Sequence, residues 1–183
     1  GPGYRGRPVG SSARTSIAAR CVVEAYGPRR RPLLQGSREA YHVGVLILLP
    51  PSEGKTAPVE GPPLDLASLL DAERLTSPRR ELMSALDAVS RRPDGPAILG
   101  LGPRGAGLAK VNLSLETSPC APAHQLFTGV LYEAARLDSI AEEEAGRRVL
   151  ERHCIIFSGL WGVLSPTDPV PDHRLSMGTS LPG

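Results

Sequence analysis

The sequence has 183 residues, of which 40% are hydrophobic and 22% charged, a composition typical of one globular domain with its own core. No apolar run reaches the roughly 20 residues that span a bilayer, and the first 20 residues lack the apolar stretch of a secretory signal. The three cysteines, Cys21, Cys120 and Cys154, cannot all pair and show no metal-ligand spacing. We therefore expect a protein of the reducing cytoplasm, without membrane contact.

The net charge of +2 is distributed unevenly along the chain. Residues 1–42 contain eight arginines and two glutamates, whereas residues 43–183 contain 13 basic and 17 acidic side chains. The first segment is rich in Gly, Arg, Ser and Pro and buries too little apolar surface to fold, so we predict a disordered basic extension. The alternative is a basic arm that contacts phosphates. Residues 43–183 are predicted to form the folded domain, whose negative charge means that nucleic-acid binding needs a local cluster of cations.

The predicted domain begins with a strand and two helices. The apolar run at 43–49 predicts a strand buried on both faces, followed by a turn at 52–56 and a loop at 57–63. Leucines at helical spacing then predict a helix over 65–75.

Ser77 followed by Pro78 predicts the start of the second helix, which ends near residue 91. This helix is expected to bury Leu82, Leu86 and Val89. Its other face carries four arginines that we expect to lie in solvent, namely Arg79, Arg80, Arg91 and Arg92.

The second half of the domain contains two further predicted helices and a strand. Prolines predict a break at 119–122, and a helix follows over 128–137, with Val130, Leu131, Ala134 and Ala135 on its apolar side. Phe127 and Tyr132 are expected to pack in the core. Ser139 caps a predicted helix over 139–152, and the run Cys154–Phe157 predicts a short buried strand.

A stiff loop with charged side chains follows the last strand. Its prolines restrict the backbone, and among them stand Asp168, Asp172, His173 and Arg174. Loops that follow parallel strands meet at one sheet edge, so Lys55 is expected to join this group. Lys55 and Arg174 would bind an anion there. The alternative is a structural interaction between Asp168 and Arg174 that fixes the loop.

Other chemistries have little support in the sequence. Gly54-Lys55-Thr56 resembles the end of a phosphate-binding loop, but Leu49 stands where the first glycine of that motif is required. The histidines are not spaced as metal ligands, and no nucleophile-elbow pattern surrounds a serine or cysteine. We therefore predict no metal and no cofactor.

Three stretches match, in order and spacing, the motifs of one known family. Ser158–Gly178 resembles the S-G-L-[YW]-G-V-[LV]-x-P-x-D-x-x-x-x-[YH]-R-L-x-M-G block of the YaaA family of peroxide-stress-response proteins. Val45–Thr56 resembles its opening strand and S-P-[AS]-K-T turn, and Phe127–Tyr132 resembles its F-x-G-x-x-Y. The resemblance covers residues 43–183 and not 1–42. It implies an α+β fold with a mixed sheet surrounded by helices, and it implies that the family's C-terminal portion is absent here.

Residues 98–110 resemble the hairpin and second helix of a helix-hairpin-helix element, whose pattern is close to L-P-G-I-G-P-K-x-A. Gly100 and Gly102 would let the backbone approach a phosphate closely, and Arg104 and Lys110 would add positive charge on the same side.

The match to this element has two departures. The preceding helix is predicted to end near Pro93, about eight residues before the motif requires, and Gly105 and Gly107 weaken the second helix. A glycine-rich loop without a ligand is the alternative. The resemblance to the YaaA family, which is associated with DNA binding through such an element, favours the motif.

We therefore predict a monomeric, cytoplasmic DNA-binding protein of the response to hydrogen peroxide, whose contacts do not depend on base sequence. The stress role rests on the resemblance alone. The predicted contacts to double-stranded DNA are Lys55, Gly100, Gly102, Arg104, Lys110 and Arg174. The alternative is an enzyme that acts on a phosphorylated or nucleotide-like small molecule through Lys55, Asp168, His173 and Arg174. A third possibility is a truncated, inactive fragment.

Overall fold

The computed structural model describes residues 45–182, so the basic extension predicted at 1–42 lies outside the described residues. Within them, helices and strands follow one another irregularly, which confirms the predicted α+β class. In chain order the elements are β1 (Ile47–Leu49), β2 (Gly54–Lys55), η1 (Leu66–Ser68), α2 (Ala72–Ser90), α3 (Gly95–Ile98), η2 (Pro103–Ser114), β3 (Cys120–Pro122), α4 (Ala123–Leu126), β4 (Phe127–Thr128), α5 (Val130–Ala135), α6 (Leu137–Ala141), α7 (Glu144–His153), β5 (Cys154–Ser158), β6 (Gly162–Leu164) and β7 (Pro169–Pro171).

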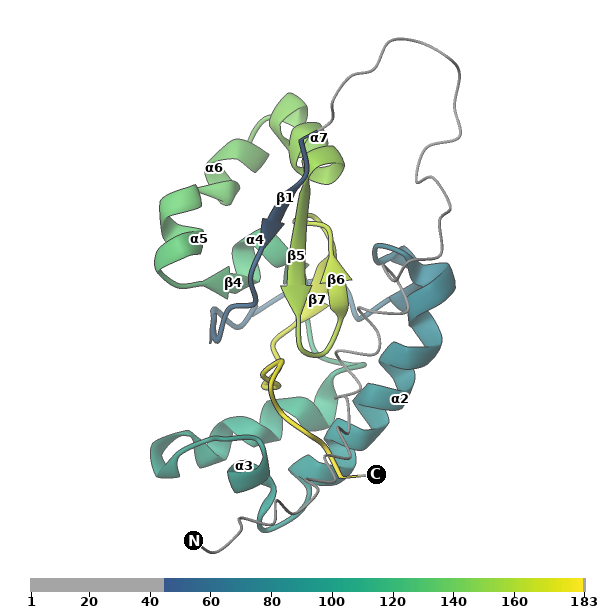
Figure 1. Cartoon of the computed structure of the whole chain (residues 1–183), viewed down its shortest axis with the longest axis vertical. Helices are drawn as coiled ribbons and strands as arrows, with labels where there is room; N and C mark the ends of the chain where they lie inside the picture. The colour runs from purple at the N-terminus through teal and green to yellow at the C-terminus, as the bar shows by residue number, and fades with distance from the viewer. Residues whose placement is uncertain (1–44, 183) are drawn as a thin grey trace, which may run out of the picture.

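The central sheet has three strands in the order β1-β5-β6. β1 runs parallel to β5, with Ile47 opposite Cys154, and β6 runs antiparallel to β5, so the predicted mixed sheet is confirmed. Two smaller antiparallel pairs, β2 with β4 and β3 with β7, lie beside it. In Figure 1, α5 and α6 lie on one side of the sheet and α2 on the other, α7 lies at the upper end of the sheet, and α3 and η2 form the lower end of the molecule.

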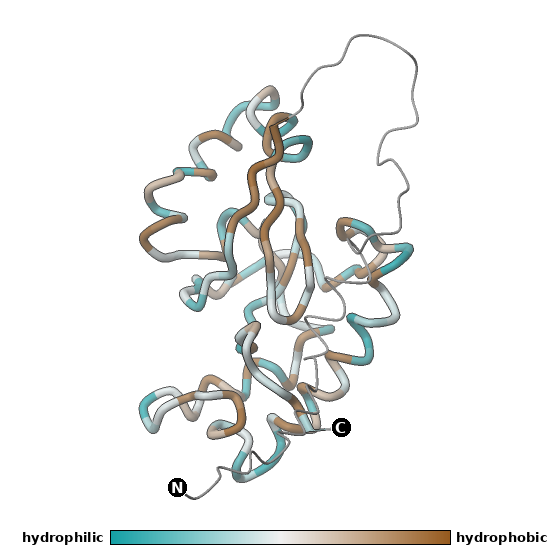
Figure 2. Tube along the Cα trace, in the orientation of Figure 1, coloured by the Kyte–Doolittle hydropathy of each residue, from teal (hydrophilic) through white to brown (hydrophobic). Residues whose placement is uncertain are grey.

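One buried cluster joins residues of α2, of β5 and of the segment that follows β5. Hydrophobic residues concentrate in β1, β5 and β6 (Figure 2). Trp161 and Ile156 are fully buried, as is Leu86 on α2. The predicted burial of Leu82 and Val89, and of Phe127 and Tyr132, is confirmed. Such burial contributes on the order of 1.5–3 kcal/mol for each large apolar side chain.

The first strand is shorter and more exposed than predicted. Its hydrogen-bonded part spans three residues, and the side chains of Ile47 and Leu48 are 51% and 55% exposed. β1 lies at the edge of the sheet and pairs only with β5 among the described strands. The apolar run predicts a strand, but burial of its two faces depends on the elements packed over them, and these leave Ile47 and Leu48 about half exposed.

The two helices predicted over 65–75 and 77–91 are one α-helix, α2, preceded by a short 3-10 turn. The break falls at 69–71 because tertiary contacts take the backbone groups of Leu70 out of helical hydrogen bonding. Its amide donates to Asp168 at 2.8 Å, and its carbonyl accepts from Arg79 at 2.9 Å. Asp71 then turns the chain with a left-handed φ of 57°. Pro78 lies inside the helix and does not begin it.

Arg79 is buried, which corrects the prediction that all four arginines of this helix lie in solvent. Its Nε donates to the carbonyl of Trp161 at 3.0 Å, and Nη2 donates to Leu70 and to Val163, both at 2.9 Å. The other three arginines are exposed, as predicted. Arg79 follows Leu75 by one turn and therefore lies on the apolar stripe of α2.

The helices predicted over 128–137 and 139–152 are also divided differently. Thr128 pairs with Gly54 in the β2–β4 ladder, so α5 begins only at Val130, which is 87% exposed. Of the expected apolar side, Val130, Leu131 and Ala134 face outward and only Ala135 packs partly against the core. Tyr132 is the buried residue of α5. The second helix is broken into α6 and α7. Gly146 lets α7 fold back on α6, since an added Cβ would lie 1.9 Å from the carbonyl oxygen of Ile140.

The predicted break at 119–122 and the proline-rich loop contain strands that the sequence did not suggest. β3 pairs with β7 through residues that include Pro122 and Pro169. Proline is tolerated because each of these strands is an edge. Gly159, in the turn after β5, lets residue 175 approach closely, since a Cβ there would lie 2.4 Å from the carbonyl oxygen of Leu175. The strand predicted at Cys154–Phe157 is confirmed as β5.

Between residues 45 and 182, no helix combines the length and the apolar character needed to cross a membrane.

We predict that Arg79→Met lowers the free energy of unfolding by about 3–5 kcal/mol, because three buried carbonyl groups lose their donor. Arg80→Met, one residue further along α2 and exposed, is the matched control and should change it by less than about 0.5 kcal/mol. Urea unfolding followed by tryptophan fluorescence measures both. Equal stabilities of the two variants would contradict the structural role of Arg79.

Candidate functional site

Lys55 lies in β2, directly after the first strand and its two prolines. Its Nζ donates to the carbonyl of Ser52 at 3.0 Å and lies 5.4 Å from the centre of the Phe127 ring. Lys55 pairs with Phe127 in the β2–β4 ladder, so the strand pairing itself sets the lysine on that ring. The contact is a cation–π interaction at the usual distance.

The F-x-G-x-x-Y stretch holds the turn that carries Lys55. The hydroxyl of Tyr132 donates to the carbonyl of Pro50 at 2.6 Å. Gly129 has a φ of 117°, a conformation that favours glycine, and the hydroxyl of Ser52 donates to the carbonyl of Thr128 next to it. Two stretches far apart in sequence thus form one structural unit, which the sequence motifs alone did not reveal.

Arg174 and Asp172 form a partly buried ion pair next to Lys55. Nη1 of Arg174 lies 2.6 Å from Oδ1 of Asp172, with 15% and 10% of the two side chains exposed. The charges of both residues act on Lys55. The predicted convergence of Lys55 with the loop after the last strand is therefore present, and the parallel pairing of β1 with β5 produces it.

Burial and the neighbouring cation make Lys55 an unusual lysine. Desolvation, with a further contribution from the charge of Arg174, lowers the pKa of Lys55 from 10.5 to about 8. Glu53 and Asp172 oppose this shift only in part. At neutral pH the amine is mostly charged, but a substantial fraction is neutral, unlike in an ordinary lysine.

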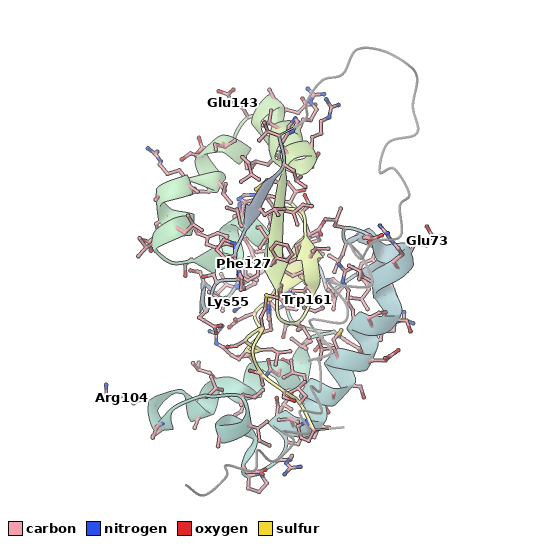
Figure 3. The ribbon with its side chains drawn as sticks, in the orientation of Figure 1. Lys55, Glu73, Arg104, Phe127, Glu143 and Trp161 are labelled. Atoms are coloured by element: carbon pink, nitrogen blue, oxygen red, sulfur yellow. The ribbon has the colours of Figure 1, made fainter. Side chains whose placement is uncertain are left out.

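His173 is fully buried and serves as part of the aromatic packing beneath the site. It meets Trp161 and Phe127 edge-on, with ring centres 5.5 and 6.0 Å apart. Nδ1 of His173 lies 3.0 Å from the carbonyl oxygen of Pro171 and 3.3 Å from Nε1 of Trp161, and the tautomer of the ring decides whether it donates to the first or accepts from the second. Burial, then the charge of Lys55, holds the pKa of His173 well below its usual value, so the ring is neutral. Figure 3 shows Lys55, Phe127 and Trp161 together in the middle of the molecule.

Asp168 has a structural position, and the predicted interaction between Asp168 and Arg174 is wrong. Asp168 accepts hydrogen bonds from the amides of Leu70 and Ser165, at 2.8 and 3.0 Å. The partner of Arg174 is Asp172. Asp168 still fixes its loop, but through backbone amides, because the chain turns between residues 168 and 172 into strand β7. Of the alternative enzyme set, the structure therefore brings together Lys55, His173 and Arg174, and Asp168 contacts other groups.

The glycine-rich hairpin lies at the lower end of the molecule. The short helix α3 precedes it, Gly100 has a φ of 70°, and η2 follows from Pro103. Arg104 and Lys110 are exposed, and neither forms an ion pair with a residue between 45 and 182. Figure 3 shows the side chain of Arg104 pointing away from the ribbon into solvent. The helix-hairpin-helix assignment itself remains a prediction.

Asn112 connects the hairpin region to the Lys55 site, and sequence reasoning missed it. This residue of η2 is buried, and its Oδ1 accepts from the amide of Arg174 at 2.8 Å. Its Nδ2 donates to the carbonyl of Arg174 and to the hydroxyl of Ser90, both at 3.1 Å. Both amide N–H groups and the carbonyl oxygen of Asn112 are therefore hydrogen-bonded. The only sequence signal was an amide between two apolar residues, Val111 and Leu113.

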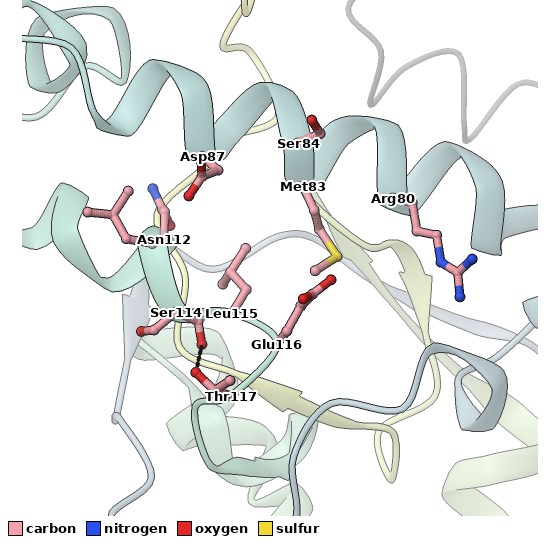
Figure 4. A pocket seen from close by; sticks show the side chains of 10 residues that line it. Arg80, Met83, Ser84, Asp87, Asn112, Ser114, Leu115, Glu116 and Thr117 are labelled. Carbon is pink, nitrogen blue, oxygen red and sulfur yellow. Dashed lines mark hydrogen bonds between the residues drawn. The ribbon is translucent and has the colours of Figure 1, made fainter.

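A separate open pocket of about 410 Å³ lies between α2 and the end of η2 (Figure 4). Its lining carries both charges, Arg80 with Asp87 and Glu116, and Asp87 is already paired with Arg91. It contains none of the predicted site residues. Within residues 45–182, no group of three or more His, Cys, Asp or Glu side chains is placed to hold a metal ion.

Comparison with known proteins identifies the family. The family model described as "Peroxide stress protein YaaA" matches residues 45–183. The chain belongs to the YaaA family. The three stretches that meet around Lys55, at 45–56, 127–132 and 158–178, all lie within the matched region.

Individual relatives of the YaaA-family chain agree with this assignment. A UPF0246 protein of Streptomyces coelicolor is 40% identical over 141 residues, which are 76% of this chain and 53% of that protein. A UPF0246 protein of Corynebacterium glutamicum is 40% identical over 138 residues, 75% of this chain and 53% of the relative. The chain therefore spans about half the length of the curated relatives that it matches.

We predict that the amine of Lys55 titrates near pH 8. Competitive acetylation at a series of pH values, read by mass spectrometry, measures the neutral fraction of each lysine. Labelling of Lys55 should rise with pH and reach half its maximum near pH 8, because acetylation requires the neutral amine. Lys110 is the internal reference, since the sequence contains only these two lysines. A midpoint for Lys55 near 10.5, its value without burial, would contradict the described surroundings of its side chain.

We also predict that Asn112→Ala lowers the free energy of unfolding by about 2–4 kcal/mol, because the partly buried amide and carbonyl of Arg174 lose their partner. Glu116→Ala, at an exposed position just after η2, should change it by less than about 0.5 kcal/mol. Urea unfolding of both variants gives the comparison. If Asn112→Ala is as stable as the control, Asn112 does not join the two regions.

Proposed function

We propose that the protein binds double-stranded DNA through phosphate contacts that do not depend on base sequence, in the cytoplasmic response to peroxide. It acts as a monomer and without a cofactor. The stress role is taken from the description of the matching family model, "Peroxide stress protein YaaA". DNA binding is argued from the cations of the described residues.

The observation that carries the proposal is the pair of hydrogen bonds between Asn112 and the backbone of Arg174. Asn112 belongs to η2, the same element that presents Arg104 and Lys110. Arg174 stands beside Lys55. Two of the four cations thus belong to η2, which is hydrogen-bonded to the segment that carries Arg174, and Lys55 on β2 lies beside that arginine. In a domain of net negative charge, binding to a polyanion requires a local group of cations, and this connection between the two pairs supports one.

The hairpin and η2 offer two kinds of contact to a phosphate, one from charged side chains and one from backbone amides. Arg104 and Lys110 are exposed and free of carboxylate partners among the described residues, so they can neutralise phosphates without losing an ion pair. Around Gly100, Gly102 and Gly107 there is open space where side chains would otherwise stand. A backbone without side chains lets a phosphate approach its amides closely. Neither type of contact reads the base sequence.

Fluorescence anisotropy with a labelled duplex tests the proposal. Four neutralised phosphates predict that log Kd rises with log salt concentration with a slope of about 4. Arg104→Ala should weaken binding equally on unrelated sequences and reduce this slope by about 1, as should Lys110→Ala.

The matched control is Arg148→Ala, which removes the same charge from α7 at the other end of the molecule (Figure 1). It should leave the slope unchanged. Salt-independent binding, or an equal loss in the control, would overturn the proposal.

A further inference from the structure

Among residues 45–182, Lys55 has no ion-pair partner of the kind that usually accompanies a half-buried ammonium group. Within the same range its Nζ has one hydrogen-bond acceptor, the carbonyl of Ser52, and it lies over the face of the Phe127 ring. No carboxylate of residues 45–182 forms a salt bridge with it, because Asp172, the charged neighbour on the loop, is bound to Arg174. A neutral amine is better accommodated in such a place than it is at the protein surface.

Desolvation beside a second cation is a recognised way to turn a lysine into a nucleophile. Both conditions hold for Lys55, which is partly buried and stands next to the guanidinium of Arg174. The site also contains two groups that would stabilise a positively charged adduct on Lys55. The carbonyl of Ser52 and the ring of Phe127 that now hold the ammonium group would hold a protonated imine at the same nitrogen.

Arg174 can also bind a phosphate next to this amine. Its Nη1 makes both of its side-chain hydrogen bonds, to Asp172 and to the carbonyl of His173. Nε and Nη2 donate to no group among residues 45–182. Two parallel N–H groups match two phosphate oxygens. The site thus combines a carbonyl-reactive amine with a phosphate-binding group.

We propose that Lys55 forms a reversible imine with the ring-opened aldehyde of a phosphorylated deoxyribose, as found at an abasic position in duplex DNA. This inference rests on the proposed DNA binding, which would bring such an aldehyde to the site. Arg174 binds the phosphate that flanks the sugar. The same chemistry exists in free deoxyribose 5-phosphate, which is the second source to be tested.

The reaction balances without a further reagent. The lone pair of the neutral Nζ attacks the aldehyde carbon, a C–N bond forms, and a proton moves from nitrogen to the carbonyl oxygen to give a carbinolamine. The carbinolamine takes up one proton from solvent and loses water as the C–O bond breaks, which leaves a protonated imine on Lys55. Addition of water reverses both steps, so no oxidant or reductant is consumed.

Borohydride reduction converts the imine to a stable amine and reports it as a covalent adduct. The full chain is incubated at pH 7.5 with a duplex that contains one abasic site, treated with borohydride, and analysed by gel and by peptide mass spectrometry. We expect the adduct on Lys55, and its loss in Lys55→Arg, which keeps the charge but removes the primary amine. The variant Arg148→Lys adds an ordinary exposed lysine on α7, and Lys55 should be modified on the order of a hundredfold more than this introduced residue.

Binding is measured separately, by anisotropy with a duplex that carries a tetrahydrofuran abasic analogue, which has no aldehyde. Wild-type protein that binds this analogue but yields no adduct with the abasic duplex overturns the imine and leaves DNA binding intact. An adduct spread over Lys110 and the introduced lysine also overturns it. Protein that binds no duplex refutes the proposed function. In that case an adduct on Lys55 with deoxyribose 5-phosphate supports the amine chemistry and assigns it to the free sugar phosphate, and its absence overturns the inference.

Discussion

The fold depends on one buried guanidinium group. Arg79 donates from the apolar stripe of α2 to the carbonyls of Leu70, Trp161 and Val163, and so joins the helix to the turn and strand that follow β5. Asp168 accepts from the amide of the same Leu70. Hydrogen bonds from Nε and Nη2 to three backbone carbonyls help to offset the cost of burying this charge, so these backbone groups have little freedom to move. The segment after β5 is therefore fixed against α2 by contacts that do not involve the side chains of the Lys55 site.

The Lys55 site is a consequence of this fixed segment. Residues 172–174 follow it, Trp161 and His173 pack beneath, and Phe127 supplies the surface on which Lys55 rests. The amine is held by a strand pair on one side and meets a guanidinium on the other. The pKa of Lys55 is thus lowered by its burial within the fold and by the charge of Arg174. The binding proposal and the imine proposal both use Lys55 and Arg174, two neighbouring cations in partly buried surroundings, and the binding proposal adds the exposed Arg104 and Lys110.

Motifs predicted this site better than periodicity predicted the elements around it. The charged loop, the lysine after the first strand and the F-x-G-x-x-Y stretch were recognised from residue order, and they converge in the structure. Helix bounds failed wherever a distant residue competed for the backbone. Leu70 gives its amide and carbonyl to Asp168 and Arg79, and Thr128 pairs with Gly54, so both leave the helices that local spacing predicted. The four arginines of the second predicted helix were predicted to lie in solvent because they are charged. Arg79 is buried instead, because its guanidinium donates to three backbone carbonyls.

The sequence by itself determined the family, the α+β class, the apolar face of α2 and the strand β5, because each of these is encoded in nearby residues. Only the tertiary structure decided that Asn112 bonds to Arg174, that Asp172 and not Asp168 is the partner of that arginine, and that His173 is buried. These facts depend on which segments meet in space. Hydrogen bonding and desolvation act over a few ångströms, and no spacing along the chain reports such distances between residues 62 positions apart, as Asn112 and Arg174 are.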